Sequence, residues 1–545
     1  MGIGLKHWVD RARASACLWL LPACVLATEA QQTLDLRVAP GDTLIGIGQR
    51  YLEPPARWRE LARLNRVRNP RHLQPGTVLR IPLDWLRWSP LDAEVVHVHG
   101  AVQGDRGPLA AGMRLAQGAR WDTGADGLLT LRLPDGSLVR FAPQTRAGLG
   151  VARQAPLGGV RATRIELDQG GVEATVQPQD APAGRFEVKT PRVVTAVRGT
   201  RFRVAQDAQA SRHEVLEGSV TAQGAGPAVA EIASGSGLRA QDGQLGAIVP
   251  LLPAPDLSTI PALLERSTQQ LQVAPLAGAA GWRWQVAADG EFVQPLRDAG
   301  TRAPQWLLAG LPDGNYFLRV RAADAQGLEG QDAQLAFVLR ARPEPPMLLA
   351  PRAGASVSGV IPLAWTRADG AARYHLQVAR DAAFTDLVRD QPGIVAERIT
   401  LEPALAAGSY HWRLASQRPD GSDGPFGDPA GFRVLEPSQM QAPQRDAAGW
   451  QLSWSGPAGM QHQVQLATTD DFSAPLLERE VAGSTLTIPD PAPGSYRART
   501  RTVLPDGGYG SWSATQRFEV SAPPPPAPPP SRPWYLLLLL LLPLL

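Results

Sequence analysis

Apolar and polar residues alternate in short runs over residues 93–249. The segment LLTLRLPDGSLVRF (residues 128–141) alternates leucine with polar residues, turns at Pro-Asp-Gly, and resumes the alternation at Val139 and Phe141. A side-chain period of two is that of a strand with one buried face, and a short Gly-containing turn between two such runs is typical of a β-hairpin. Similar runs separated by Gly or Pro recur to residue 249, so this region is predicted to be all-β.

Residues 34–82 combine strand-like and helix-like spacing. Apolar residues alternate at the start of the segment and again just before Pro82, as in two strands. Between them lie two helical patterns, the first with Asp42 or Thr43 as its N-cap and the second beginning near Pro55. The predicted order is therefore strand, helix, helix, strand. The first helix would place Leu44, Ile47 and Tyr51 on one face, and the second would place Trp58, Leu61 and Leu64 on one face.

The glycines at the start of this segment also raise the possibility of a phosphate-binding loop. From Gly41 the spacing G-x-x-x-x-G is present, but Ile47 and Gly48 stand where such a loop needs Lys and Ser or Thr. The chemistry for holding phosphates and magnesium is missing, and G-x-G-x-x-G from Gly46 fails at Tyr51, so neither nucleotide-binding loop is predicted here.

Three similar segments indicate an internal repeat over residues 265–521. WRWQVAADGEF (282–292), YHLQVARDAAF (374–384) and HQVQLATTDDF (462–472) share Gln at position four, Ala at six and Phe at eleven. Each is followed by a G-x-Y sequence, and turn clusters such as Pro-Asp-Gly separate the strand-like runs. A repeated unit of this kind with alternating strands suits a small β-sandwich.

The two ends of the chain differ from the regions between them. Residues 1–30 read as a secretory signal, with basic residues before an apolar run and small residues after it. The same stretch contains a lipoprotein-like box ending at Cys24, so lipidation of Cys24 is a second interpretation. At the other end, a Pro-rich linker (522–533) precedes a short apolar tail (534–545), which falls short of the roughly 20 residues that a spanning helix needs. We expect this tail to contact a membrane.

Charge and composition argue against several classes of function. The chain has 545 residues, with 54 Lys and Arg against 51 Asp and Glu. The basic residues are scattered rather than gathered into a stripe, which argues against a nucleic-acid partner. Both cysteines lie in the first 24 residues, so an exported chain would lack disulfides. The sequence has no G-x-S-x-G, no H-E-x-x-H and no carboxylate pair marked by its context, and an exported chain would have no nucleophilic cysteine. The prediction is a non-enzyme with no catalytic residues, no cofactor and no metal, although carboxylates far apart in sequence could still meet in space.

The first folded segment resembles the LysM domain, a module that binds N-acetylglucosamine-containing glycans such as peptidoglycan. The resemblance rests on V-x-x-G-D-T-L from Val38, L-x-x-x-N ending at Asn65, and N-P-x-x-L-x-P-G-x-x-L-x-I-P from Asn69. It implies a glycan-binding groove between two loops. The implied glycan-binding residues are Gly41, Asp42, Thr43 and Leu44 on one side and Asn69, Leu73, Gln74 and Pro75 on the other. The alternative is structural: a cap at Asp42 or Thr43, a turn at Pro75, and a core position at Leu44.

The all-β region resembles the FecR domain of periplasmic signalling regulators. The matching pieces are VVHVHGAV (95–102), LPDGSLVRFAP (133–143) and FEVKTPRVVTAVRGTRFRV (186–204). The regulators carry an anti-sigma segment before a membrane helix, whereas this chain begins with a signal-like and a LysM-like segment. The repeats in turn resemble fibronectin type III modules, with Trp365 and Trp454 as core residues and, in the first repeat, a core rebuilt around Trp282 or Trp284.

His97 and His99 lie two residues apart in a predicted strand. Side chains at this spacing share a face and could share a metal ion. The sequence offers no third ligand at a motif spacing, so surface histidines of a strand are the preferred interpretation.

The predicted fold class is a multidomain, mainly β chain with a small βααβ LysM-like domain, an all-β FecR-like domain and three β-sandwich repeats. The predicted segments are 1–30, 34–82, 93–249, 265–341, 345–436, 440–521, 522–533 and 534–545. The favoured function is a non-catalytic bacterial envelope protein that binds peptidoglycan and acts as a scaffold for an envelope protein partner, exported to the periplasm or cell envelope and in contact with a membrane. The alternatives are a FecR-like periplasmic sensor and, third, a cell-wall hydrolase.

Overall fold

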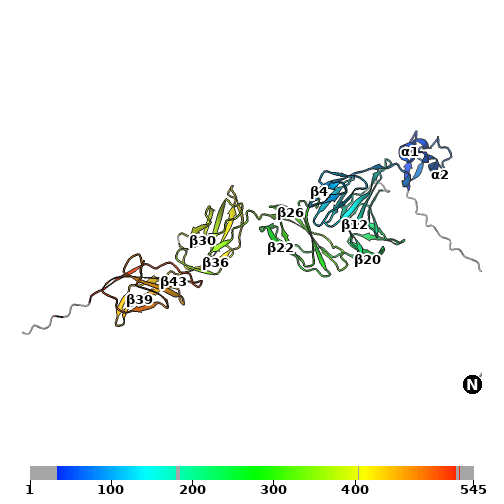
Figure 1. Ribbon diagram of the computed structural model, residues 1–545. Helices are drawn as coiled ribbons and strands as arrows, with labels where there is room; N and C mark the ends of the chain where they lie inside the picture. Colours follow the sequence, from blue (N-terminus) through cyan, green and yellow to red (C-terminus); the bar gives the residue numbers. More distant parts are fainter. Residues whose placement is uncertain (1–32, 179–183, 403, 523–526, 528–545) are drawn as a thin grey trace, which may run out of the picture. The chain divides into compact units, whose positions relative to one another are not determined.

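The computed structural model describes residues 33–178, 184–402, 404–522 and 527 (Figure 1). Strands dominate these residues, and the α-helices lie near the start of the described chain. The predicted fold class, multidomain and mainly β with a small helical segment, is confirmed. The predicted signal segment (1–30) and apolar tail (534–545) lie outside the described residues.

The described chain clusters into two compact units. The first comprises residues within Met1–Asp256, Ala274–Pro304 and Phe317–Gln334. The second comprises residues within Leu257–Val273, Gln305–Tyr316 and Leu335–Leu545. The segment predicted as the first repeat (265–341) therefore contributes to both units.

The first unit begins with a two-stranded sheet and two short helices. The elements are β1 (Thr33–Arg37), α1 (Leu44–Tyr51), the 3-10 turn η1 (Pro55–Arg57), α2 (Trp58–Leu64), β2 (Val78–Pro82) and the 3-10 turn η2 (Leu83–Trp85). β1 and β2 pair antiparallel, with Thr33 opposite Pro82 and Arg37 opposite Val78. The predicted order of strand, helix, helix and strand is confirmed.

The core of this small fold buries most of the predicted apolar faces. Leu44, Ile47 and Leu61 are fully buried. Leu64 is 48% exposed, so the predicted apolar face of the second helix is buried only in part. α2 has only seven residues and ends at Leu64, and the helix buries Leu61 and Ala62 instead.

A hairpin from the following barrel completes the same core. Ala155, Leu157 and Val160 belong to the apolar cluster that contains Leu44 and Ile47. They lie at the connection between β11 and β12, more than sixty residues beyond β2. Since burial of apolar area stabilises both contributors, the helical segment and the hairpin support each other.

Strands β3 to β20 form a closed barrel. Its strands are β3 (Ser89–Pro90), β4 (Ala93–His99), β5 (Gln103–Gly104), β6 (Gly107–Pro108), β7 (Arg114–Leu115), β8 (Arg120–Asp122), β9 (Leu128–Arg132), β10 (Leu138–Phe141), β11 (Arg146–Gln154), β12 (Arg161–Thr175), β13 (Arg185–Lys189), β14 (Val194–Val197), β15 (Arg201–Gln206), β16 (Ala210–Glu217), β17 (Ser219–Gln223), β18 (Val229–Ala233), β19 (Ser236–Gln241) and β20 (Gln244–Pro250). The predicted hairpin is β9–β10, with Leu131 opposite Val139. The apolar residues of its alternating pattern, including Phe141, lie in the barrel core.

The first repeat supplies strands to both units. Its strands are β21 (Leu263–Leu264), β22 (Thr268–Gln272), β23 (Gly281–Ala287), β24 (Pro295–Thr301), β25 (Gln305–Ala309), β26 (Gly314–Ala323) and β27 (Ala333–Leu339). β23 pairs antiparallel with β24 and with β26, and β22 pairs with β25. Both predicted core residues of this repeat are buried, Trp284 completely and Trp282 to 5% exposure.

The second and third repeats are each built of two sheets. The second contains β28 (Leu348–Ala350), β29 (Ala355–Ser358), β30 (Pro362–Trp365), β31 (Arg373–Ala379), β32 (Leu387–Ile394), β33 (Arg398–Thr400), β34 (Gly408–Gln417), β35 (Asp423–Phe426) and β36 (Ala430–Leu435). The third contains β37 (Gln439–Met440), β38 (Gln444–Asp446), β39 (Gly449–Ser455), β40 (Gln461–Ala467), β41 (Leu477–Ala482), β42 (Thr485–Ile488), β43 (Gly494–Val503) and β44 (Gln516–Val520). Trp365 and Trp454 are buried in the respective cores, as predicted.

The tyrosine of each G-x-Y sequence fixes the start of a long strand. Tyr316, Tyr410 and Tyr496 are buried, and each hydroxyl donates to the carbonyl four residues earlier, at 2.9, 3.0 and 2.7 Å. A buried phenol needs a partner for its hydroxyl, and these bonds supply one. The shared tyrosine is therefore a structural part of the repeat.

Candidate functional site

The two loops predicted to line a glycan groove are held side by side by backbone hydrogen bonds. The Leu44 N–H donates to the Pro70 carbonyl at 3.4 Å, and the Gly76 N–H donates to the Val38 carbonyl at 2.8 Å. Gly41, Thr43, Asn69, Gln74 and Pro75 are exposed, Asp42 and Leu73 are half-buried, and Leu44 is fully buried. The structure thus brings the two sets of predicted residues together.

Several of the predicted residues also have local structural roles. The Thr43 hydroxyl caps α1 by accepting from the Gly46 N–H at 3.1 Å. The Asp42 carboxylate accepts from the Ala39 N–H at 2.8 Å, and the Asn69 side chain accepts from the Arg71 N–H at 3.1 Å. These bonds satisfy backbone donors that a turn or a helix end leaves unpaired.

Leu44 stands apart from the other predicted residues. Its side chain lies in the apolar core with 0% exposure. A ligand at the loops can therefore meet only its backbone, and contact with the Leu44 side chain is not available in this fold. The predicted core role of Leu44 is the one that its burial supports.

A second concentration of polar side chains lies where the barrel meets the β23–β24–β26 sheet within the first unit. Glu173 on β12 is at its centre, with a side chain that is 8% exposed. Arg319 on β26 donates to both carboxylate oxygens of Glu173, at 3.0 and 2.9 Å. Arg201 donates to Glu173 at 3.1 Å, and Arg140 forms an ion pair with it at 3.7 Å. A bidentate arginine–carboxylate pair fixes both distance and orientation.

A further network surrounds Arg203 of the barrel. Its Nε donates to Glu214 at 2.7 Å, and its Nη2 donates to the Glu329 and Gly330 carbonyls at 2.7 Å each. The Glu329 N–H donates in turn to Glu214 at 2.7 Å. Asp332 accepts from Arg203 at 3.2 Å. Buried charges of this kind are stable only when their hydrogen bonds are satisfied, and here the two parts of the unit satisfy each other.

The barrel also forms hydrogen bonds to backbone carbonyls between β23 and the start of β24. Arg140 donates to the carbonyls of Phe292 and Glu291, at 2.8 and 2.7 Å. His97 Nε2 lies 2.8 Å from the Pro295 carbonyl and donates to it, because a carbonyl can only accept. These contacts bind backbone atoms of the loop and of Pro295, the first residue of β24, and do not depend on the side chains at those positions.

The His97 and His99 pair contacts protein groups in this arrangement. Arg297 Nη1 lies 3.0 Å from His99 Nε2, which accepts this hydrogen bond. Burial, followed by the charges of Arg297 and His97, lowers the pKa of His99. Among the residues that the structure describes, no group of three or more His, Cys, Asp or Glu is placed to hold a metal ion. The two histidines therefore act as contacts between the barrel and the neighbouring sheet.

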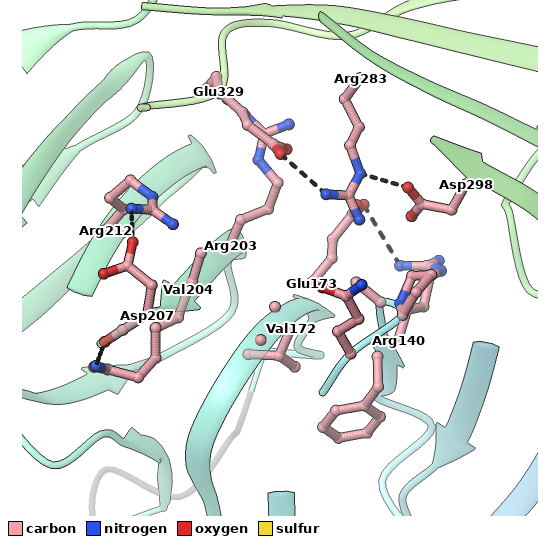
Figure 2. Close-up of a pocket in the computed structure, with 18 of the residues that line it drawn as sticks. Arg140, Val172, Glu173, Arg203, Val204, Asp207, Arg212, Arg283, Asp298 and Glu329 are labelled. Atoms are coloured by element: carbon pink, nitrogen blue, oxygen red, sulfur yellow. Dashed lines mark hydrogen bonds and ion pairs between the residues drawn. The ribbon is translucent and has the colours of Figure 1, made fainter. Parts of the chain in front are cut away.

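A cavity of about 540 Å³ adjoins these networks. Figure 2 shows its charged lining, with Arg283 between Asp298 and Glu329. Arg212 forms a further ion pair with Asp207 at 2.5 Å. Charges of both signs line the cavity, and several of them pair with one another.

The pKa values follow from this pairing. Burial by itself would raise the pKa of Glu173, but Arg319, Arg140, Arg321 and Arg201 outweigh it and hold the pKa well below its usual range. Glu173 therefore stays ionised. For Glu214 burial prevails over Arg203, with Glu329 adding to it, and its pKa is raised. These ion pairs are therefore suited to holding the barrel and the β23–β24–β26 sheet together.

The sequence interpretation did not identify this junction. Glu173 and Arg319 lie 146 residues apart, and periodicity carries no information on such a contact. One signal was available: an arginine stands three residues after the tyrosine of each G-x-Y sequence, as Arg319, Arg413 and Arg499. Aligning the three repeats beyond the tyrosine shows this shared arginine.

The remaining sequence predictions concern the two ends. The signal segment, the lipidation of Cys24, and the apolar tail all fall outside the described residues. Within the described residues, no helix is both long enough and apolar enough to cross a membrane.

Comparisons with known families support the first two resemblances. A LysM domain model matches residues 36–82, and a FecR protein model matches residues 119–221. Both matches lie within the segments predicted to be LysM-like and FecR-like, in the predicted order. No curated protein matches the chain.

Solved structures match parts of the chain at low identity. Two structures of a candidate anti-sigma factor from Parabacteroides distasonis ATCC 8503 are 16% and 15% identical, with TM-scores of 0.20 and 0.21. Each match covers 24% of this chain and 59% of the other, so the chain spans less than two thirds of the length of these proteins. The FN1–FN3 domains of chicken CNTN1 are 13% identical with a TM-score of 0.21, over 50% of this chain and 99% of that chain.

Proposed function

We propose that this chain is a non-catalytic bacterial envelope protein that binds peptidoglycan through its LysM domain and presents its β domains to a protein partner. The observation that carries the proposal is the LysM match over residues 36–82. LysM domains bind N-acetylglucosamine-containing glycans, and together with FecR domains they suggest a protein of the cell envelope. No reaction is assigned, since LysM, FecR and fibronectin-like domains are typically non-catalytic.

The proposed glycan contacts are the exposed groups of the two neighbouring loops. Backbone groups of Gly41 and the side chains of Asn69 and Gln74 are open to solvent, and Pro75 offers an apolar surface. Sugars need both kinds of surface, because their hydroxyls and acetamido groups form hydrogen bonds while their ring faces contact apolar groups. Asp42 and Thr43 contribute mainly by fixing the shape of the first loop.

Gln74 provides the sharpest test, because its side chain is exposed and α1 offers a matched control at Gln49. We expect Gln74→Ala to weaken co-sedimentation with purified peptidoglycan sacculi by roughly three- to tenfold, the effect of losing one hydrogen bond. Gln49→Ala should bind as the unchanged protein does. Soluble N-acetylglucosamine oligomers should compete with the sacculi.

Point variants are preferable to removing residues 34–82 as a whole. That deletion would expose Leu157 and Val160, which share the core of the LysM segment, and would disturb the barrel. Equal binding by the Gln74 and Gln49 variants would contradict the proposed loop contacts. Release of soluble muropeptides from the sacculi would instead favour a cell-wall hydrolase.

A second candidate function is that of a periplasmic sensor or regulator. The FecR match over residues 119–221 favours it. Under this proposal the barrel relays a signal to a membrane partner. An altered transcriptional response after Glu173→Gln, with glycan binding retained, would support the regulator over the scaffold.

A further inference from the structure

The three repeats share a row of side chains across neighbouring strands. In the first repeat Arg319 lies opposite Gln285, which lies opposite Asp298. The second and third repeats have the equivalent rows Arg413–Gln377–Asp390 and Arg499–Gln465–Glu478. The glutamine at position four of the repeated sequence thus has the same place in all three sheets.

The contacts within the row are also shared. The Nε of Arg319, Arg413 and Arg499 donates to the oxygen of the neighbouring glutamine at 2.9, 3.0 and 2.9 Å. The phenylalanine at position eleven then lies against the guanidinium. Its ring centroid is 4.1, 4.0 and 4.0 Å from the guanidinium carbon in the three repeats. The row therefore holds each arginine in a fixed orientation.

In the first repeat this oriented arginine is the residue that binds the barrel. Arg319 places its Nη1 and Nη2 on the two oxygens of Glu173. In this repeat the row therefore binds a carboxylate that belongs to the chain itself. Among the described residues, no carboxylate forms an ion pair with Arg413 or Arg499, the equivalent arginines of the other repeats.

The third repeat matches the first most closely, because it has a second arginine at the same spacing. Arg501 follows Arg499 by two residues, as Arg321 follows Arg319. Strand geometry places such residues on one face, about 7 Å apart. Arg501 donates to Gln463 at 2.6 Å, and both arginines of the third repeat are partly exposed.

The third repeat lacks the internal carboxylates that neutralise the first. Glu329 is bridged to Ala323, and the equivalent bridge in the third repeat joins Tyr509 to Val503. Three residues further on, Asp332 of the first repeat corresponds to Trp512. Arg321 pairs with Glu329 and Asp332, whereas the equivalent Arg501 lies 3.9 Å from the ring of Tyr509 and 4.2 Å from that of Trp512.

Arg499 and Arg501 are therefore cations without an acidic partner among the described residues. Trp512 lies 4.2 Å from the Arg499 guanidinium as well. Burial lowers the pKa of Arg499, with the charge of Arg501 acting in the same direction and Glu478 opposing it. The nearby carboxylates are engaged elsewhere: Glu478 accepts from Gln463 at 2.7 Å and Glu480 from Tyr509 at 2.9 Å.

We propose that the sheet face of the third repeat bearing Arg499 and Arg501 docks a protein partner that presents carboxylates on alternate residues of an extended strand. The aromatic rings leave the guanidinium edges to bind carboxylates in the plane, as Arg319 binds Glu173. Two arginines spaced by two residues match acidic side chains at the same spacing in the partner. This inference rests on the presenting role proposed above, and it does not depend on glycan binding.

The test uses the full-length chain in a nonionic detergent and a labelled extended peptide, acetyl-TEVEVET-amide. Fluorescence anisotropy should show binding of this peptide and none of its neutral counterpart, acetyl-TQVQVQT-amide. Arg499→Gln and Arg501→Gln should each weaken binding by roughly tenfold or more, the effect of losing a charge-assisted hydrogen bond. Arg499→Lys should give an intermediate value, because it keeps the charge but loses the planar fork.

A matched control comes from the other sheet of the same repeat. Arg445 is exposed on β38 and pairs with Asp490, so Arg445→Gln removes an equal charge away from the proposed surface. It should leave the affinity unchanged. Equal binding of the acidic and neutral peptides, no binding of the acidic peptide, or an equal effect of Arg445→Gln would overturn the inference. The first comparison needs no variant, so it holds even if an arginine variant unfolds.

The outcome is separable from that of glycan binding. The peptide experiment contains no peptidoglycan, and Gln74→Ala should bind the peptide normally. Loss of sacculus binding with retained peptide binding would therefore contradict the LysM proposal alone. The reverse result would contradict the docking surface alone.

Discussion

The phenylalanine shared by the repeats has an unusual backbone conformation. Phe292, Phe384 and Phe472 have φ values of 55, 59 and 53°, in the left-handed region that residues other than glycine rarely adopt. Each ring lies against the arginine of its repeat. Glycine would adopt this backbone conformation at a lower energy cost than phenylalanine. The contact between the ring and the guanidinium compensates for that cost.

Because of this conformation, we expect glycine at position 472 to destabilise the fold less than alanine, which reverses the usual order. Phe472→Ala removes the buried ring but keeps a Cβ at positive φ, and we expect it to lower the free energy of unfolding by about 3 kcal/mol. Phe472→Gly removes the ring and also the backbone cost, which is about 1 kcal/mol for an L-residue in this region. The glycine variant should therefore be the more stable of the two.

Urea unfolding of the two Phe472 variants, followed by tryptophan fluorescence, measures this difference. A matched pair at Phe518, a buried strand residue of the same repeat, serves as control. There glycine should be less stable than alanine, because a regular strand position gives glycine no advantage. An alanine variant at 472 that is more stable than the glycine variant would contradict the proposed cost.

At the scale of elements, a histidine joins three strands of the second repeat. His375 on β31 bonds Asp390 on β32 at 2.5 Å through Nε2 and Asp423 on β35 at 2.7 Å through Nδ1. Both ring nitrogens donate only in the protonated imidazolium. Burial would lower the pKa of His375, but the hydrogen bonds to the two aspartates outweigh it, so the pKa is raised.

The raised pKa gives the second repeat a pH-dependent contribution to stability. A group whose pKa is higher in the folded state stabilises the fold fully below its unfolded pKa, which is about 6.5 for histidine. That contribution is lost as the pH rises through the higher folded value. We expect the difference in melting temperature between the unchanged protein and His375→Gln to be largest near pH 6 and to shrink above pH 7.

Calorimetry of both proteins at several pH values gives the comparison directly. His72→Gln is the control, since His72 is exposed in the LysM segment and belongs to the other unit. Its effect on the melting of the second repeat should be flat across the same pH range. A His375 difference that grows with rising pH would contradict the assignment.

The elements themselves were predicted well where one short segment determines them. The alternation at 128–141 forms the β9–β10 hairpin, and Thr43 caps the predicted first helix. The apolar face of α2 is buried at Leu61 but exposed at Leu64, because the short helix ends there and burial depends on what packs against each position. The hairpin residues Leu157 and Val160 were not linked to the LysM core, because local pattern does not show which distant apolar residue fills a gap.

The candidate site also has a part that the sequence predicts and a part that it does not. The neighbouring loops at Gly41 and Gln74 followed from a family resemblance, whereas the junction around Glu173 did not follow from any pattern. Its arginines and carboxylates look like ordinary solvated charges in sequence, since Arg and Glu are mostly exposed in proteins. Only the fold brings them together and excludes water from them.

At the scale of the whole molecule, the first unit combines segments that lie far apart in the sequence. The barrel, the strands β23 and β24 and β26 from Phe317 onward belong to it, although the predicted repeat places those strands with the sandwiches. The two parts meet through buried ion pairs. Glu173 of the barrel pairs with Arg319 and Arg321, and Asp332 pairs with Arg201 and Arg203. Such pairs specify an arrangement because a misplaced partner leaves a buried charge unsatisfied.

Glu173→Gln should therefore loosen both parts of this unit together. The substitution leaves Arg319 buried without its bidentate partner, and breaking a buried pair costs about 3 kcal/mol or more in the free energy of unfolding. Hydrogen exchange should become faster in β12 and in β26 at the same time, although these strands come from different parts of the sequence.

Peptides from β40 and β43 of the third repeat should keep their exchange rates. Glu231→Gln, an exposed carboxylate of β18 in the same barrel, should change none of these rates. If β12 alone responded to Glu173→Gln, the barrel and the sheet would be independent, and the ion pairs would be a contact between them rather than part of one cooperative fold.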